Sequence, residues 1–198
     1  MITFCGRQLQ TGQLVNYKTE PEIVIRDEND GDAGAISEVT IAAFKTMKIS
    51  NHTEQFIIEA LRTANALAVS LVAEVNGRVV GHIAFSPATI SDNSRNWYGL
   101  GPISVLPAYQ KQGIGKALVE TGLSRLQDMG AKGCCLVGHP EYYKKFGFKN
   151  ISGLVYEGVP SEFFFVLSFD GNYPQGAVRF HDAFNADGPQ VQQNGSSS

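Results

Sequence analysis

Val105-Leu-Pro-Ala-Tyr-Gln-Lys-Gln-Gly-Ile-Gly-Lys-Ala-Leu118 is the stretch of this sequence that decides the fold. An apolar run ends at Pro107, a short polar segment follows, and a helical pattern starts directly after the glycines. The first turn of a helix carries backbone N–H groups without partners, and the helix dipole favours negative charge there. Gly113 and Gly115 leave no Cβ in the way of a close ligand. The stretch therefore predicts a pyrophosphate-binding turn between a strand and a helix.

Two common phosphate-binding motifs do not fit this turn. A P-loop has four residues between its glycines and then Gly-Lys-Ser/Thr, and the dinucleotide fingerprint would need a third glycine near Leu118. Neither is present. The pattern that remains over residues 110–115 is Gln-x-x-Gly-x-Gly, which resembles the acetyl-coenzyme A signature of the GNAT N-acetyltransferases.

A second motif lies further along the chain, at His139-Pro-Glu-Tyr-Tyr-Lys-Lys-Phe-Gly-Phe148. Many GNAT proteins carry a Tyr four residues before a Gly-Phe pair at this point, and here that residue is Tyr143. Together with the later Val159-Pro-Ser-Glu-Phe163, the motif resembles the YhbS-like subgroup of acetyltransferases. The resemblance covers roughly residues 23–170.

Composition narrows the function classes. The 198 residues suit a single domain, and 43% hydrophobic with 18% charged residues is typical of a soluble globular protein. A net charge of −3 gives no reason to expect nucleic-acid binding. No apolar run approaches the ~20 residues of a membrane span, and residues 1–10 lack the apolar core of a signal peptide. We therefore expect a cytoplasmic protein without a membrane or nucleic-acid partner.

The hydrophobic pattern predicts alternating strands and helices. Asn76-Gly77 between two apolar runs is a strong hairpin signal. Asp32 is expected to cap the first helix, and Asn51 with Glu54 to form a capping-box-like start of the second. Strands are expected at 22–26, 71–75, 78–85, 97–106, 133–138 and 163–169. Helices are expected at 32–45, 114–129 and 141–146, and one more is expected to begin at the capping box of residues 51–54 and to end at residue 61.

This order matches the mixed α/β GNAT fold. The resemblance implies a mostly antiparallel sheet with flanking helices and one parallel strand pair that splays to admit the cofactor. We expect residues 1–22 to be an N-terminal extension and residues 23–184 to be the acetyltransferase domain. Residues 185–198 are Gly-, Gln- and Ser-rich, which predicts a disordered tail.

The resemblance also implies roles for individual residues. Backbone groups of Ile103, Ser104 and Val105 would hold the pantetheine arm and the thioester carbonyl. Tyr143 would protonate the leaving thiolate or hold its sulfur. The pyrophosphate would be wrapped by main-chain groups of the turn, namely Gln110, Lys111, Gln112, Gly113, Ile114, Gly115 and Lys116.

The general base stays open at the level of sequence. His82 and Glu74 on the hairpin, His139 at a strand end, and a water chain are all candidates. No spacing typical of a metal site is present, and Cys134 and Cys135 are expected to be buried apolar residues.

The sequence therefore predicts an acetyl-CoA-dependent N-acetyltransferase without a metal, acting on the amine of a small molecule or peptide. A homodimer is possible. The alternatives are a non-catalytic acyl-CoA-binding or sensor module on the same fold, and a different α/β protein that binds a phosphate ligand at the same turn.

Overall fold

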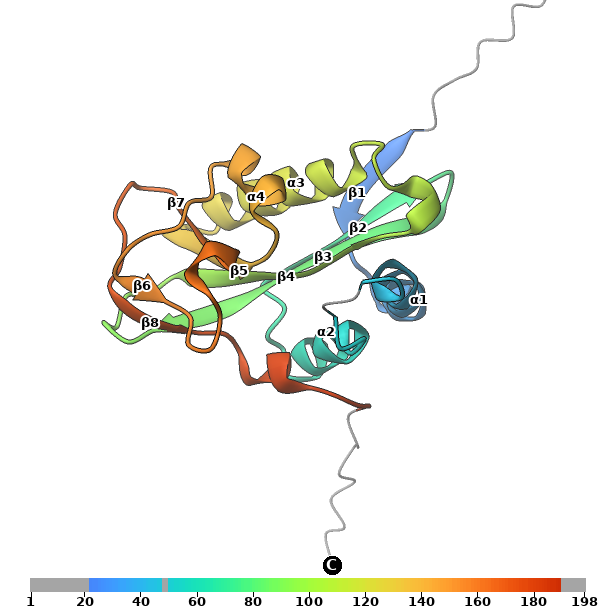
Figure 1. Ribbon diagram of the computed structural model, residues 1–198. Helices are drawn as coiled ribbons and strands as arrows, with labels where there is room; N and C mark the ends of the chain where they lie inside the picture. Colours follow the sequence, from blue (N-terminus) through green and yellow to red (C-terminus); the bar gives the residue numbers. More distant parts are fainter. Residues whose placement is uncertain (1–21, 48–49, 190–198) are drawn as a thin grey trace, which may run out of the picture.

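The computed structural model describes residues 22–47 and 50–189 (Figure 1). The strands are β1 (Ile23–Asp27), β2 (Val69–Val75), β3 (Arg78–Ile90), β4 (Trp97–Val105), β5 (Gly133–Val137), β6 (Leu154–Val155), β7 (Phe164–Ser168) and β8 (Gly176–Arg179). The helices are α1 (Ala33–Phe44), α2 (Glu54–Thr63), α3 (Ile114–Asp128) and α4 (Pro140–Tyr143). Short 3-10 turns are η1 (Asp30–Asp32), η2 (Pro107–Tyr109), η3 (Lys144–Phe146), η4 (Ser161–Phe163) and η5 (Asp182–Asn185).

One sheet runs through the centre of the molecule in the order β1-β2-β3-β4-β5-β7. Neighbours along this path are antiparallel except β4 and β5, which are parallel. Helices α1 and α2 cover one face, and α3 and α4 lie on the other (Figure 1). The predicted fold class, a mostly antiparallel mixed sheet with flanking helices, is confirmed.

The parallel pair separates soon after it forms. β4 and β5 pair only through Trp97–Gly99 and Gly133–Cys135. β4 then continues to Val105 alongside β3, while β5 continues to Val137 alongside β7. The strands thus diverge toward the end of β4 that leads into α3, as the resemblance implied.

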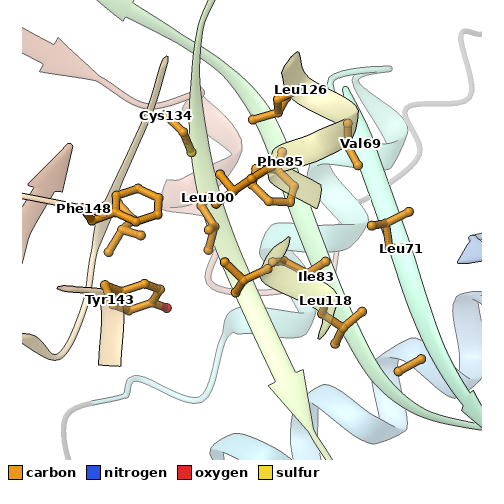
Figure 2. Close-up of a cluster of buried hydrophobic side chains, with 14 of the residues drawn as sticks. Val69, Leu71, Ile83, Phe85, Leu100, Leu118, Leu126, Cys134, Tyr143 and Phe148 are labelled. Atoms are coloured by element: carbon orange, nitrogen blue, oxygen red, sulfur yellow. The ribbon is translucent and has the colours of Figure 1, made fainter. Parts of the chain in front are cut away.

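The main core lies between the sheet and α3. Ile114, Leu118 and Leu126 of α3 are fully buried and pack with Ile83 and Phe85 of β3 (Figure 2). This helix was predicted over residues 114–129, and it ends one residue earlier. Met129 is exposed because the helix ends at Asp128 and Gly130, at φ +75, turns the chain away.

Two strands were not predicted from sequence. β3 extends to Ile90, beyond the expected end at Phe85, and Thr89 and Ile90 pair with β8. β8 also pairs in parallel with β6. β6 has two residues and β8 four, so neither is long enough to produce a recognisable alternation, and their pairing partners are distant in sequence.

Both predicted helix caps were wrong in detail. The carboxylate of Asp32 makes no capping bond to α1, because it accepts from the guanidinium of Arg26 and from the N–H of Asn29. Thr53, not Asn51, precedes α2, and the Glu54 carboxylate accepts from the Ser50 hydroxyl. Long-range and neighbouring partners outcompete the local caps in both places.

The predicted extension at residues 1–22 lies outside the described residues except for Glu22. Of the predicted disordered tail at 185–198, residues 190–198 lie outside them, whereas residues 185–189 are described: Asn185 belongs to η5, and Ala186 packs against the cluster that contains Leu61 and Ala183. Within 22–47 and 50–189, no helix is both long and apolar enough to cross a membrane.

Candidate active site

The backbone at the end of β4 presents polar groups to the opening between β4 and β5. The N–H of Leu106 donates to the carbonyl of Val80 on β3 at 2.8 Å. Because backbone groups alternate in direction along an antiparallel strand, those of Ser104 also point to β3. The groups of Ile103 and Val105 therefore point to the opening. Of the three predicted residues, only these two present their backbone there.

One of these groups already has a partner. The Val105 carbonyl accepts from the Gln110 side chain, with Nε2 to oxygen at 3.0 Å. The Gln112 side chain likewise donates to the Ala108 carbonyl at 3.0 Å. Both glutamines thus fold back onto η2 and brace the turn, which leaves their backbones, and not their side chains, to face a ligand.

The turn before α3 has the geometry that the sequence predicted. Gly113 is in the left-handed region at φ +87, and Lys111 also has positive φ, at 62. The first intrahelical bond runs from the Ala117 N–H to the Gly113 carbonyl. Among the described residues, the N–H groups of residues 111–116 find no acceptor, as the geometry of a first turn requires. They form a cradle of free N–H groups at the positive end of the helix dipole, an arrangement that suits an anion.

Tyr142 of α4 closes one side of this cradle. A Cβ added to Gly115 would lie 2.7 Å from the Tyr142 hydroxyl oxygen. Lys145 places its Nζ 4.1 Å from the centroid of the Tyr142 ring and so adds positive charge beside it. The sequence assigned no role to Tyr142. Only the packing of α4 against the start of α3 brings its hydroxyl to the turn.

Tyr143 points into a different place. Its ring is buried, packs edge-on against Phe148 with centroids 6.0 Å apart, and lies against Gly138 at the end of β5. Figure 2 shows its hydroxyl oxygen on the side of the ring that faces the strand carrying Leu100. Burial raises the pKa of Tyr143 far above the ordinary value for a tyrosine. Tyr143 is therefore a neutral hydrogen-bond donor at any physiological pH.

The cationic side chains of the turn are at the surface. Lys116 is 61% exposed and lies 3.6 Å from Glu120, one helical turn along α3. Lys111 is also exposed. Because solvent screens exposed charges, these lysines would attract an anion only weakly. The backbone N–H groups of the turn are therefore the stronger feature for holding an anion.

These features fit coenzyme A. Unpaired N–H groups at a helix N-terminus suit a pyrophosphate. The unpaired edge of β4 offers N–H and C=O groups to the amides of a pantetheine arm. Gly115 leaves room that a side chain would remove.

The chain is similar to several known proteins of one family. Residues 66–150 match the acetyltransferase (GNAT) domain. The chain is 35% identical over 125 residues to the uncharacterized N-acetyltransferase YjhQ of Escherichia coli. This match covers 62% of this chain and 67% of YjhQ. A GNAT family acetyltransferase from Brucella melitensis, solved with acetyl-CoA, is 47% identical with a TM-score of 0.75 and covers 83% of this chain and 99% of its own. The chain belongs to the GNAT acetyltransferase family.

YhbS of Escherichia coli, a GNAT protein solved with CoA, is 29% identical with a TM-score of 0.78. The match covers 86% of this chain and 96% of that one. The predicted family and the resemblance to YhbS are both confirmed.

GNAT chemistry also needs an acceptor for the proton of the amine. The three side chains proposed for this role differ in their partners and in their burial. Glu74 pairs with Arg26, with Oε2 to Nε at 2.9 Å, and is part of an ion-pair cluster with Asp32. His139 is exposed in the connection between β5 and α4. His82 is fully buried on β3.

His82 is held by a polar network that sequence reasoning missed. Its Nε2 lies 2.9 Å from the Ser70 hydroxyl and 3.6 Å from Glu28 Oε2. Ser70 donates to Glu28 at 2.7 Å, and Arg62 donates two hydrogen bonds to the same carboxylate at 3.0 and 2.9 Å. These residues are up to 54 positions apart, so no local motif could have revealed them.

Burial and charge act in opposite directions in this network. Burial lowers the pKa of His82, and the neighbouring Glu28 only partly opposes this. Burial alone would raise the pKa of Glu28, but hydrogen bonds from His82, Arg62 and Ser70 lower it to about 2. The network thus pairs a neutral imidazole with an ionised carboxylate.

These shifts predict loss of stability in acid. The unfolded chain protonates His82 near pH 6.5, whereas the folded chain resists protonation to lower pH. His82 therefore lowers the free energy of unfolding as pH falls from 6.5 through its folded pKa. Glu28 adds a second loss as pH falls from 4.5 toward about 2. Thermal melts of wild type and His82→Gln across this range should diverge below pH 6.5, with the variant less acid-sensitive; parallel curves would contradict the assignment.

Two open grooves lie away from the cradle. One is lined by residues that include Asp27, Glu28, Ser70 and Arg125, and the other by residues that include Arg95, Lys132 and Asp170. Neither contains a residue of the α3 turn or of α4. Within the described ranges, no group of three or more His, Cys, Asp or Glu side chains is arranged to hold a metal ion.

Proposed function

We propose that this protein transfers an acetyl group from acetyl-CoA to an amine. The observation that carries the proposal is the position of the unpaired β4 edge beside the α3 cradle. It joins a pyrophosphate site and a thioester site at one opening. The acetyl-CoA in the Brucella relative and the CoA in YhbS support the same ligand.

In this proposal the chain holds its cosubstrate mostly through backbone groups. The N–H groups of residues 111–116 bind the pyrophosphate, and the Tyr142 hydroxyl supports them from α4. The free edge at Ile103 and Val105 aligns the pantetheine arm. When bound there, acetyl-CoA supplies a thioester that a neutral amine can attack.

Tyr143 acts on the leaving sulfur. A tyrosine with a raised pKa keeps its proton, since an ordinary thiol has a pKa of about 8.5. Full proton transfer from Tyr143 to a thiolate is therefore uphill. We assign Tyr143 a hydrogen bond that stabilises the departing thiolate, not the role of a free acid. Most of the rate enhancement then comes from positioning and from donors aimed at developing charge.

The acceptor is an amine on a small molecule or a peptide. The test is a panel of amines of both kinds with acetyl-CoA, read by thiol release and by mass of the product. We expect at least one amine to be acetylated, with release of one thiol per product. Tight CoA binding without turnover of any amine would instead favour a binding or sensor module. Binding of ATP but not of CoA would overturn the cofactor assignment.

A further inference from the structure

Lys145 of η3 is an exposed cation that two aromatic rings hold beside the cradle. Its Nζ lies 4.1 Å from the centroid of the Tyr142 ring and 5.1 Å from that of the Phe146 ring. The two rings meet edge-on, with their centroids 5.5 Å apart. The face of an aromatic ring carries partial negative charge and attracts a cation. The rings therefore favour one position for the ammonium of an otherwise flexible side chain.

The charge of Lys145 is not cancelled by a neighbouring carboxylate. The adjacent lysine does have such a neighbour, since Lys144 Nζ lies 4.0 Å from Glu141 Oε1. In the part of the chain that the structure describes, Lys145 takes part in no ion pair. Its ammonium can therefore meet an anion from outside the chain without breaking an existing pair.

The Tyr142 ring connects this ammonium to the cradle. The hydroxyl oxygen at one end of the ring lies 2.7 Å from the place that a Cβ of Gly115 would take. Burial raises the pKa of Tyr142, so the hydroxyl stays protonated and the ring stays neutral. Lys145 Nζ lies over the face of the same ring. An anion in the cradle would thus meet the Tyr142 hydroxyl, whereas Lys145 faces the space beside the cradle.

Coenzyme A carries a further phosphate that could occupy this space. Its pyrophosphate joins two parts of the molecule, the pantetheine arm and a ribose that bears a phosphate at its 3′ position. In the proposed binding mode the pantetheine arm follows the edge of β4 at Ile103 and Val105. The ribose must then leave the cradle on another side. Tyr142 borders the cradle on such a side, and Lys145 supplies the positive charge there.

We propose that Lys145 binds the 3′-phosphate of the cofactor and lets the protein distinguish CoA from dephospho-CoA, which lacks that group. The inference rests on the proposed use of acetyl-CoA. A lysine ammonium binds phosphate as a point charge with three donors. A lysine side chain loses conformational entropy when it is fixed on an anion. Because the two rings already hold the ammonium in place, this loss is smaller at Lys145.

The main test compares CoA with 3′-dephospho-CoA by titration calorimetry. Wild type should bind CoA about tenfold more tightly, because one charge-assisted contact at an exposed site is added. Lys145→Met removes the charge and keeps an unbranched apolar side chain on the two rings. Its Kd for CoA should rise about tenfold, whereas its Kd for dephospho-CoA should change less than about twofold. The preference of wild type should also weaken at higher ionic strength, because salt screens exposed charges.

Three further variants separate this contact from other effects. Lys144→Met is the matched control, since it removes the same charge one residue away, and it should keep the wild-type preference. Tyr142→Phe keeps the ring under Lys145 and removes the hydroxyl at the cradle. It should weaken both ligands by the same factor and leave the preference intact. Lys145→Arg should keep the preference, because a guanidinium also stacks on aromatic rings and binds phosphate.

Equal Kd values of wild type for the two ligands would overturn the proposal and leave acetyl transfer from CoA intact. A preference that survives in Lys145→Met would overturn it as well. So would an equal loss of both ligands in that variant, because Lys145 would then act on the pyrophosphate. Melting curves check that the variant is folded, and Lys145→Gln replaces it if it is not. A wild type that binds neither ligand would overturn the cofactor assignment and this proposal together.

Discussion

Gly115→Val is expected to weaken CoA binding by about 10²–10⁴-fold while the protein stays folded. A Cβ at this position would meet the Tyr142 hydroxyl oxygen at 2.7 Å, so a branched side chain must displace Tyr142 or stand in the cradle. Either result separates the phosphate from the first-turn N–H groups. Hydrogen bonds to charged groups are worth about 1.5–3 kcal/mol each, and the loss of two accounts for the expected range.

The measurement is titration calorimetry with CoA, and α1 supplies a matched control. Gly34 is an exposed helical glycine whose added Cβ would meet nothing within 4 Å. Gly34→Val should therefore leave CoA affinity unchanged. Melting curves must show both variants folded. A folded Gly115→Val protein with wild-type affinity would remove the cradle from the cofactor site.

The cradle was predictable because its cause is local. The turn needs a glycine at φ +87, a polar connection and the start of a helix, and consecutive residues of the sequence supply all three. The hairpin at Asn76-Gly77 is a similar case, since both residues have positive φ and that turn favours this pair. The same locality explains why α3 was correct apart from Met129 at its end.

The polar network around His82 could not be predicted, because its members meet only through the sheet. His82 was one of several open candidates for the base. The different surroundings of His82 and Glu74 depend on two ion-pair systems that the sequence does not display. Arg26 forms an ion pair with Glu74. Glu28, which lies next to His82, pairs with Arg62 and accepts a hydrogen bond from Ser70. Strand register, which sequence alone did not supply, decides both.

The short helix α4 shows how one motif can carry two functions. Its adjacent tyrosines leave the helix about 100° apart, and their rings meet at 88° with centroids 5.0 Å apart. The Tyr142 hydroxyl reaches the start of α3, whereas Tyr143 packs beneath it in the core. The sequence motif marked Tyr143 alone. The structure adds Tyr142 as a residue of the cradle.

Tyr143→Phe is therefore expected to slow the chemical step, and Tyr142→Phe to weaken cofactor binding. Tyr143→Phe keeps the ring that packs on Phe148 and removes only the oxygen. A hydrogen bond to a developing thiolate is worth about 1.5–3 kcal/mol, so the single-turnover rate should fall about 10- to 100-fold. CoA affinity should change little.

Tyr142→Phe is the matched variant, with the same atom removed one residue away. Losing one hydrogen bond at the pyrophosphate should raise the Kd for CoA about tenfold, which corresponds to about 1.4 kcal/mol. The rate at saturating acetyl-CoA should stay near that of wild type. Single-turnover measurements are needed so that product release does not mask the step. If both variants lost affinity and neither lost rate, Tyr143 would be a packing residue, and the departing thiolate would depend on backbone donors alone.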